Sequence, residues 1–230
     1  MKKNYKRKKI TKQLINNLNE LSVKGLCDIH IGKDGCGVGV VANIKGVKSN
    51  KIIKDSLTVL NNLAHRGACG CDPDTGDGAG ITLQIPDKFF RKILKENKLS
   101  LPDLGQYASG IIFLPNEKKL RKIIINIIEK ILLKNKLSLI SWRDVPVDQS
   151  KIGLWASDVK PEIKQIFIST NEKITDDEFS KILFIARKMI EKEVLSIKDN
   201  SNSTDINNEF YICSLSNKII IYKGLLKSEQ

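Results

Sequence analysis

Two periods of apolar residues alternate along the chain after residue 35. Apolar positions spaced as on one face of a helix occur at 49–64, 86–97, 116–135 and 176–197. Short runs rich in branched apolar residues separate them, at 36–44, 80–85, 108–115, 137–147, 162–170, 210–216 and 218–224. The pattern therefore predicts about four helices and about seven strands, interleaved in a layered α/β or α+β domain.

Residues at the predicted helix ends support these boundaries. Ser49 or Asn50 is placed to cap the first helix, and Pro86 stands near the start of the second. Asn116 is placed to cap the third helix. The fourth opens with Asp and Glu side chains, which suit the positive end of a helix dipole.

Residues 1–35 differ from the rest of the chain. The run Met1–Lys12 contains seven Lys and Arg residues, and no acidic residue precedes Glu20. The segment 14–23 has leucines at helical spacing and predicts a short amphipathic helix. Because no apolar stretch of a signal peptide follows the basic run, we interpret residues 1–35 as a basic leader or an arm outside the core.

Composition and charge narrow the classes of protein. Of 230 residues 41% are hydrophobic, which is enough for a sizeable core, and no apolar run approaches the ~20 residues of a membrane span. Five Cys and two His are too few and too scattered for a disulfide framework or a zinc array. The net charge of +13 comes from 33 Lys and only 6 Arg, with 6% aromatics. Proteins that bind nucleic acid usually contain more Arg and aromatic residues, so we expect no nucleic-acid partner. Because the sequence has no apolar span, we expect no membrane partner either.

Cys36 is the first candidate for chemistry. It begins the predicted strand 36–44 with glycines at 35, 37 and 39, so its thiol has little steric cover. A cysteine in such a position is usually a small core residue. It becomes a nucleophile if the chain is cleaved before it, because its own α-amino group, with a pKa near ~7.7–8, can then take the thiol proton.

The loop RGACGCDPDTGDGAG at 66–80 matches neither of two common ligand-binding loops. Read as a calcium loop from Asp72, it has Gly76, Asp77 and Leu83 at positions that require a ligand, a glycine and a glutamate. Read as a dinucleotide fingerprint, it follows a helix and precedes a strand, which is the reverse of the required order.

Three other residues of this loop carry reactive or charged groups. Cys69 and Cys71 are spaced too closely for a CxxC motif, and we interpret them as loop cysteines. Arg66 lies in a glycine-rich turn, where a guanidinium beside flexible backbone suits a substrate that carries a carboxylate. The alternative for Arg66 is an ordinary surface residue.

Taken together, these segments resemble the start of the glutamate synthase large subunit, a class II glutamine amidotransferase domain. The resemblance rests on CGVGVVANIKG, on HRGA and TGDGAG within one loop, and on RDVPVD, IKQIFIS, DEFSKILFIARKMIE and FYICSLSNKIIIYKG. It covers nearly all of residues 35–227.

The resemblance implies a fold and a set of site residues. The fold would be α+β, a four-layer αββα sandwich of the N-terminal-nucleophile hydrolase type, incomplete at its C-terminus. Residues 1–35 would be a propeptide, and 36–230 the N-terminal part of the amidotransferase domain. Cys36 would be the catalytic nucleophile that forms a γ-glutamyl thioester. Arg66 would bind the glutamine carboxylate, Asp77 and Gly78 would line the same pocket, and no metal would be bound.

The same resemblance implies cofactors and partners. Ammonia released from glutamine would serve reductive glutamate synthesis from 2-oxoglutarate in downstream domains. FMN and an iron–sulfur cluster are expected in those domains and none in this chain. The expected partners are the rest of the glutamate synthase chain and ferredoxin or a small electron-transfer subunit, in the cytoplasm or a plastid. The motifs do not distinguish ferredoxin from a nicotinamide nucleotide as electron donor.

The chain departs from the family pattern in two respects. Val40 stands where the family usually has an aromatic residue, and no HNGEINT-type segment with its oxyanion-hole Asn-Gly occurs before Gln230. The acidic residue that binds the substrate α-amino group is also absent. Loss of one oxyanion donor costs ~10²–10³ in rate, so we expect residues 1–230 alone to be inactive. We also expect poor solubility, because strands that should pair with downstream sequence would have open apolar edges. An inactive fragment with the fold, or a basic non-enzymatic binding module, are the alternatives.

Overall fold

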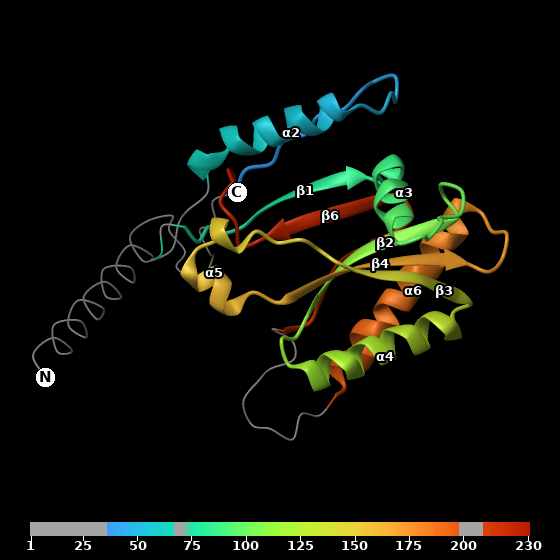
Figure 1. The fold of residues 1–230 in the computed structure, drawn as a ribbon. Helices are drawn as coiled ribbons and strands as arrows, with labels where there is room; N and C mark the ends of the chain where they lie inside the picture. Colours follow the sequence, from blue (N-terminus) through green and yellow to red (C-terminus); the bar gives the residue numbers. More distant parts are fainter. Residues whose placement is uncertain (1–35, 67–71, 73, 198–208) are drawn as a thin grey trace, which may run out of the picture. The chain divides into compact units, whose positions relative to one another are not determined.

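The computed structural model describes residues 36–66, 72, 74–197 and 209–230 (Figure 1). The chain divides into two compact units, Met1–Cys36 and Gly37–Gln230, and the elements named below belong to the second unit. The expected leader at 1–35 lies outside the described residues, as do its expected helix at 14–23 and the loop cysteines Cys69 and Cys71.

The described part of the second unit contains helices and strands in alternation. The α-helices are α2 (Asn50–Asn62), α3 (Asp87–Glu96), α4 (Lys118–Lys134), α5 (Leu154–Val159) and α6 (Asp176–Leu195). The strands are β1 (Ala79–Gln84), β2 (Tyr107–Leu114), β3 (Leu137–Asp144), β4 (Glu162–Thr170), β5 (Tyr211–Ser216) and β6 (Ile219–Gly224). Short 3₁₀ turns, η1 (Ala64–Arg66) and η2 (Gln149–Lys151), follow α2 and precede α5. None of the described helices combines the length and the apolar character that a bilayer crossing requires.

The strands form two antiparallel sheets. One sheet has four strands in the order β3-β4-β2-β5, and the other pairs β1 with β6 from Ala79↔Gly224 to Gln84↔Ile219. Strands β5 and β6 follow each other through Asn217, yet they belong to different sheets. The chain therefore passes from one sheet to the other at this turn.

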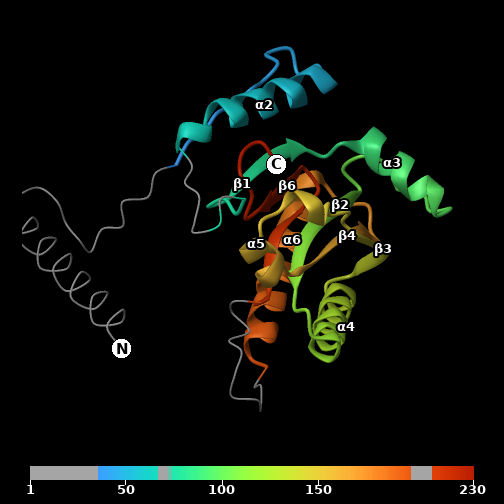
Figure 2. The same ribbon diagram turned by 60° about the vertical axis from the view of Figure 1, so that its left-hand side comes forward.

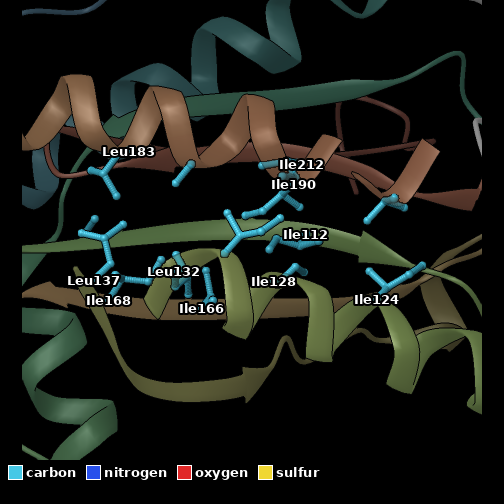
Figure 3. Close-up of a cluster of buried hydrophobic side chains, with 14 of the residues drawn as sticks. Ile112, Ile124, Ile128, Leu132, Leu137, Ile166, Ile168, Leu183, Ile190 and Ile212 are labelled. Carbon is cyan, nitrogen blue, oxygen red and sulfur yellow. The ribbon is translucent and has the colours of Figure 1, made fainter. Parts of the chain in front are cut away.

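Two hydrophobic cores separate the layers. The first lies between the four-stranded sheet and helices α4 and α6, where side chains such as Ile128, Ile166 and Ile190 are buried (Figure 3). The second lies between the two sheets and includes Phe90, Phe167 and Ile220. Strand β2 is buried almost along its whole length because it is covered on both faces.

Helix α2 completes the arrangement on the other side. It contacts β1 and lies on the side of the two-stranded sheet that faces away from the four-stranded sheet (Figures 1 and 2). The layers therefore follow in the order helix, sheet, sheet, helix. This confirms the predicted α+β class and its αββα layering.

The predicted strand at 36–44 is wrong. Residues 37–44 form no strand, and no described strand pairs with them. A Cβ added at Gly37 would lie 3.0 Å from Leu63, and one at Gly39 would overlap Val59, so this segment packs along α2. A run of small apolar residues suits a helix surface as well as a sheet. A strand forms only where a partner accepts its backbone hydrogen bonds.

The predicted helix starts are mostly at the right positions, but the predicted capping hydrogen bonds of Ser49 and Asn116 do not form. Ser49 is the N-cap of α2, as expected, but its side chain makes no capping hydrogen bond. The N-cap of α4 is Glu117 and not Asn116, whose side-chain amide donates to the Lys160 carbonyl instead. Helix α6 opens with a full capping box that we did not predict, between Thr175 and a glutamate three residues later.

Candidate functional site

Arg66 is positioned by the C-terminal end of α2. The Leu63 amide donates to the carbonyls of Val59 and Leu60, and the chain continues directly into η1. Nδ1 of His65 lies 2.9 Å from the Asn62 carbonyl oxygen, which holds this turn against the helix end. Arg66 is the last residue of η1, so the end of α2 sets the place where its side chain leaves the backbone.

Asp77 and Gly78 lie immediately before β1. The first residue of the strand, Ala79, pairs with Gly224, and an added Cβ at Gly78 would lie 3.5 Å from the Gly224 carbonyl oxygen. Gly78 has a φ of 132°, in the region that favours glycine. Asp77 is exposed. The turn at Asp77–Gly78 is thus set by the point where β1 joins β6.

The C-terminal end of α2 and the start of β1 lie at the same end of their layers in both views (Figures 1 and 2). The structure therefore places Arg66 and the Asp77–Gly78 turn at one end of the second unit. Gly37 contacts Leu63 at this end as well. Cys36 belongs to the first unit and is exposed.

Sequence reasoning missed a set of contacts that holds the part of the loop just before the Asp77–Gly78 turn. The contacts join Asp72, Asp74 and Thr75 of the loop to the N-terminus of α5 and to Lys227 and Gln230. In the sequence, Asp72 is considered only as the first position of a calcium loop, and that loop is rejected. Its carboxylate instead accepts hydrogen bonds from N–H and O–H donors, foremost the Asp74 amide, which hold the pKa of Asp72 below its usual range.

The part of the chain that the structure describes contains no group of three or more His, Cys, Asp or Glu residues that could hold a metal ion. The predicted site residues offer a thiol, a guanidinium, a carboxylate and backbone N–H groups. A thiol can attack an amide carbonyl, and a guanidinium can bind a carboxylate.

The sequence of this chain is similar to those of a known family and of several named proteins. The family model of the class-II glutamine amidotransferases matches residues 36–230. A ferredoxin-dependent glutamate synthase of Arabidopsis thaliana, named chloroplastic/mitochondrial, is 37% identical over 90% of this chain and 12% of its own length. The NADPH glutamate synthase large chain of Bacillus subtilis is 38% identical over 90% of this chain and 13% of its own length. A ferredoxin-dependent glutamate synthase of Pyropia yezoensis is 37% identical over 96% and 14%.

This chain thus spans roughly an eighth of the length of these relatives, 12–14%. The match confirms the resemblance that the CGVG, HRGA and TGDGAG segments predicted. The matched region starts at the exposed Cys36 and includes the Asp77–Gly78 turn and the strands of both sheets. From Cys36 onward, the chain belongs to the class II glutamine amidotransferases.

Proposed function

We propose that this chain provides the glutamine-hydrolysing site of a glutamate synthase, with Cys36 as the nucleophile. The observation that carries the proposal is the class II amidotransferase match, which starts at Cys36. The exposure of Cys36 supports it, because a nucleophile must reach its substrate. Relatives named glutamate synthases that match 85–96% of the chain point to the same reaction.

The proposed mechanism begins with cleavage of the peptide bond between Gly35 and Cys36. The new α-amino group takes the thiol proton, and the sulfur attacks the side-chain carbonyl carbon of glutamine. The carbon–nitrogen bond breaks, and the leaving nitrogen receives that proton and departs as ammonia. Water then hydrolyses the γ-glutamyl thioester, which releases glutamate and restores the thiol. The sum is glutamine plus water to glutamate plus ammonia.

Arg66 and the Asp77–Gly78 turn would bind the substrate. We assign the glutamine α-carboxylate to the Arg66 guanidinium, because a planar guanidinium fork can make two parallel hydrogen bonds to a carboxylate. The turn at Asp77–Gly78 would form part of the pocket wall. Its positive-φ glycine brings backbone close to the ligand without a side chain in between.

The released ammonia would be used for glutamate synthesis from 2-oxoglutarate elsewhere in the enzyme. That step is a reduction, which FMN and an iron–sulfur cluster in downstream domains would supply with electrons. The relatives are named for ferredoxin or NADPH, and we propose one of these as the electron source. We propose the cytoplasm or a plastid as the compartment, because the relatives include chloroplastic and bacterial proteins.

Ammonia release from glutamine by the full product of the gene tests this function. Cys36→Ala removes the nucleophile and should abolish glutamine-dependent activity. Synthesis of glutamate from added ammonia should remain, because ammonia bypasses the thioester step. Loss of both activities would indicate a structural role for Cys36, and activity retained without Cys36 would refute the proposal.

Intact-mass analysis of the same protein tests the cleavage step. A mature chain that begins at Cys36 is expected, since the α-amino base does not exist before cleavage. An active protein that still carries residues 1–35 would contradict this mechanism.

The Arg66 assignment has its own test. Arg66→Lys keeps the positive charge but loses the two-pronged geometry, so the KM for glutamine should rise with a smaller change in kcat. Steady-state kinetics with glutamine, and with ammonia as the control substrate, measure this. An unchanged KM for glutamine would exclude Arg66 from carboxylate binding.

A further inference from the structure

The loop before β1 is held by two segments that are distant in the sequence. On one side lies the N-terminus of α5, about eighty residues further along, and on the other lies the segment 226–230. Neither segment carries a residue of the proposed catalytic machinery. Their contacts therefore fix the conformation of the loop and take no part in the proposed reaction.

Asp72 makes the connection to α5. Its Oδ1 accepts from the Asp74 amide at 3.0 Å, within the loop itself. Its Oδ2 accepts from the Thr75 hydroxyl at 2.9 Å and from the Trp155 amide at 3.2 Å. One carboxylate thus joins the turn of the loop to the first turn of α5, where backbone N–H groups have no partner within the helix.

Thr75 makes a second connection in the same place. Its hydroxyl donates to Asp72 and accepts from the Ala156 amide at 3.2 Å, while the Gly153 amide donates to the Asp74 carbonyl at 3.1 Å. These five residues, Asp72, Thr75, Gly153, Trp155 and Ala156, are called the Asp72 tether below. Both carboxylate oxygens of Asp72 accept hydrogen bonds, and the Thr75 hydroxyl is both donor and acceptor, so the tether specifies one arrangement of the loop.

The close approach of the two segments depends on a glycine. A Cβ at Gly153 would overlap the Thr75 hydroxyl and the Asp72 carboxylate. Any larger residue at this position would push α5 away from the loop. The tether therefore requires glycine at position 153.

The other side of the loop is held by residues 226–230. Lys227 Nζ lies 3.1 Å from Asp74 Oδ1, and the Gln230 side-chain amide donates to the Asp74 carbonyl at 3.1 Å. Gly76 is buried against the backbone of Leu226. Only three residues after Thr75, the chain reaches Gly78 and enters β1. Displacement of the tether would thus be transmitted to the Asp77–Gly78 turn.

We propose that Asp72 is a positioning residue for glutamine binding, which acts by tying the loop before β1 to the start of α5. The inference rests on the proposed function, in which the Asp77–Gly78 turn lines the glutamine pocket. Asp72 does not touch the substrate. It keeps the turn in the one geometry that the pocket requires.

The test compares variants of the full gene product in glutamine hydrolysis. Asp72→Ala removes the carboxylate, and Thr75→Val removes the hydroxyl at nearly constant volume. Each should raise the KM for glutamine about tenfold or more, with a smaller change in kcat, because a misplaced pocket wall weakens binding while Cys36 keeps its own base. Thr75→Ser keeps the hydroxyl and should restore a KM near that of the wild type.

A matched control separates positioning from general loss of stability. Thr175→Ala also removes a helix cap, but from α6, and should leave the KM for glutamine unchanged. A second measurement compares the rates at which two reagents alkylate Cys36. One is a glutamine analogue that carries a diazoketone in place of the side-chain amide, and the other is iodoacetamide. The Asp72→Ala protein should react more slowly with the first and as fast as the wild type with the second.

The outcomes distinguish this inference from the proposed function. A wild type without Cys36-dependent ammonia release would overturn the proposed function and this inference with it. An active wild type with an unchanged KM in a folded Asp72→Ala protein would overturn this inference alone. Equal slowing with both reagents would also overturn it, because the change would then act on Cys36 and not on glutamine binding.

Discussion

The two helical layers of the second unit are built very differently. On one side α4 and α6 each bury five side chains against the four-stranded sheet. On the other side α2 has 13 residues and none of them is buried. The apolar residues Val38 and Val40, in the segment that packs along α2, are 84% and 86% exposed.

This difference separates stability from function within one fold. Burial of apolar surface is the main source of folding free energy, so the side with α4 and α6 supplies most of it. Arg66 follows α2 on the thinly covered side, and the Asp77–Gly78 turn, at the same end, is exposed. Regions with little buried apolar surface open at lower free energy, and binding loops are commonly found there.

The largest predicted effect compares a buried residue of α6 with an exposed one of α2. Ile190 is fully buried in the first core, so Ile190→Ala should lower the free energy of unfolding by about 2–5 kcal/mol. Leu57 in α2 is 45% exposed, so Leu57→Ala should cost less than about 1 kcal/mol. Urea unfolding of both variants measures the difference. Equal losses would show that α2 contributes as much to stability as α6.

The next effect concerns a polar contact of the core between the sheets. Asp87 in the first turn of α3 accepts hydrogen bonds from Arg91 and from the hydroxyl of Tyr107 in β2. Burial raises the pKa of the Asp87 carboxyl, but the hydrogen bonds of Arg91 and Tyr107 outweigh it and leave the pKa below its usual value of 3.8. Asp87→Asn should therefore cost about 1.5–3 kcal/mol at pH 7.

The pH dependence of Asp87→Asn follows from the sign of the shift. A carboxyl whose pKa is lower in the folded state stabilises the protein at pH values above its unfolded pKa. This contribution is lost as the pH falls below 3.8 and through the folded-state pKa. The stability difference between wild type and variant should narrow over that range in urea unfolding curves. A difference independent of pH would mean that the charge of Asp87 does not matter.

The smallest effect concerns the capping box of α6. The Thr175 hydroxyl accepts from the Glu178 amide, and the Glu178 carboxylate accepts from the Thr175 amide at 2.9 Å. Thr175→Ala should lower the free energy of unfolding by about 1 kcal/mol. Thermal unfolding monitored by circular dichroism measures it, with Thr175→Ser as the control that keeps the hydroxyl. A change in glutamine KM would contradict the separation of the two sides.

Local patterns in the sequence determine much of this protein. The helical period locates α2, α3, α4 and α6, and the apolar runs locate β1 to β6, because both periods reflect which face of an element is buried. The motifs around Cys36, Arg66 and Asp77–Gly78 predict the family, and the family match confirms it. A capping box at Thr175 is also readable in the sequence, since it needs only a threonine and a glutamate three residues apart.

The tertiary structure alone decides the rest. Residues 36–44 have a strand-like composition but no described strand beside them, and β5 and β6 lie in different sheets although they are neighbours in the chain. Helix α5 is too short to show a period. The Asp72 tether joins residues about eighty positions apart. Pairing, layering and tethering depend on which distant segments meet, and the pattern of any one segment does not contain that information.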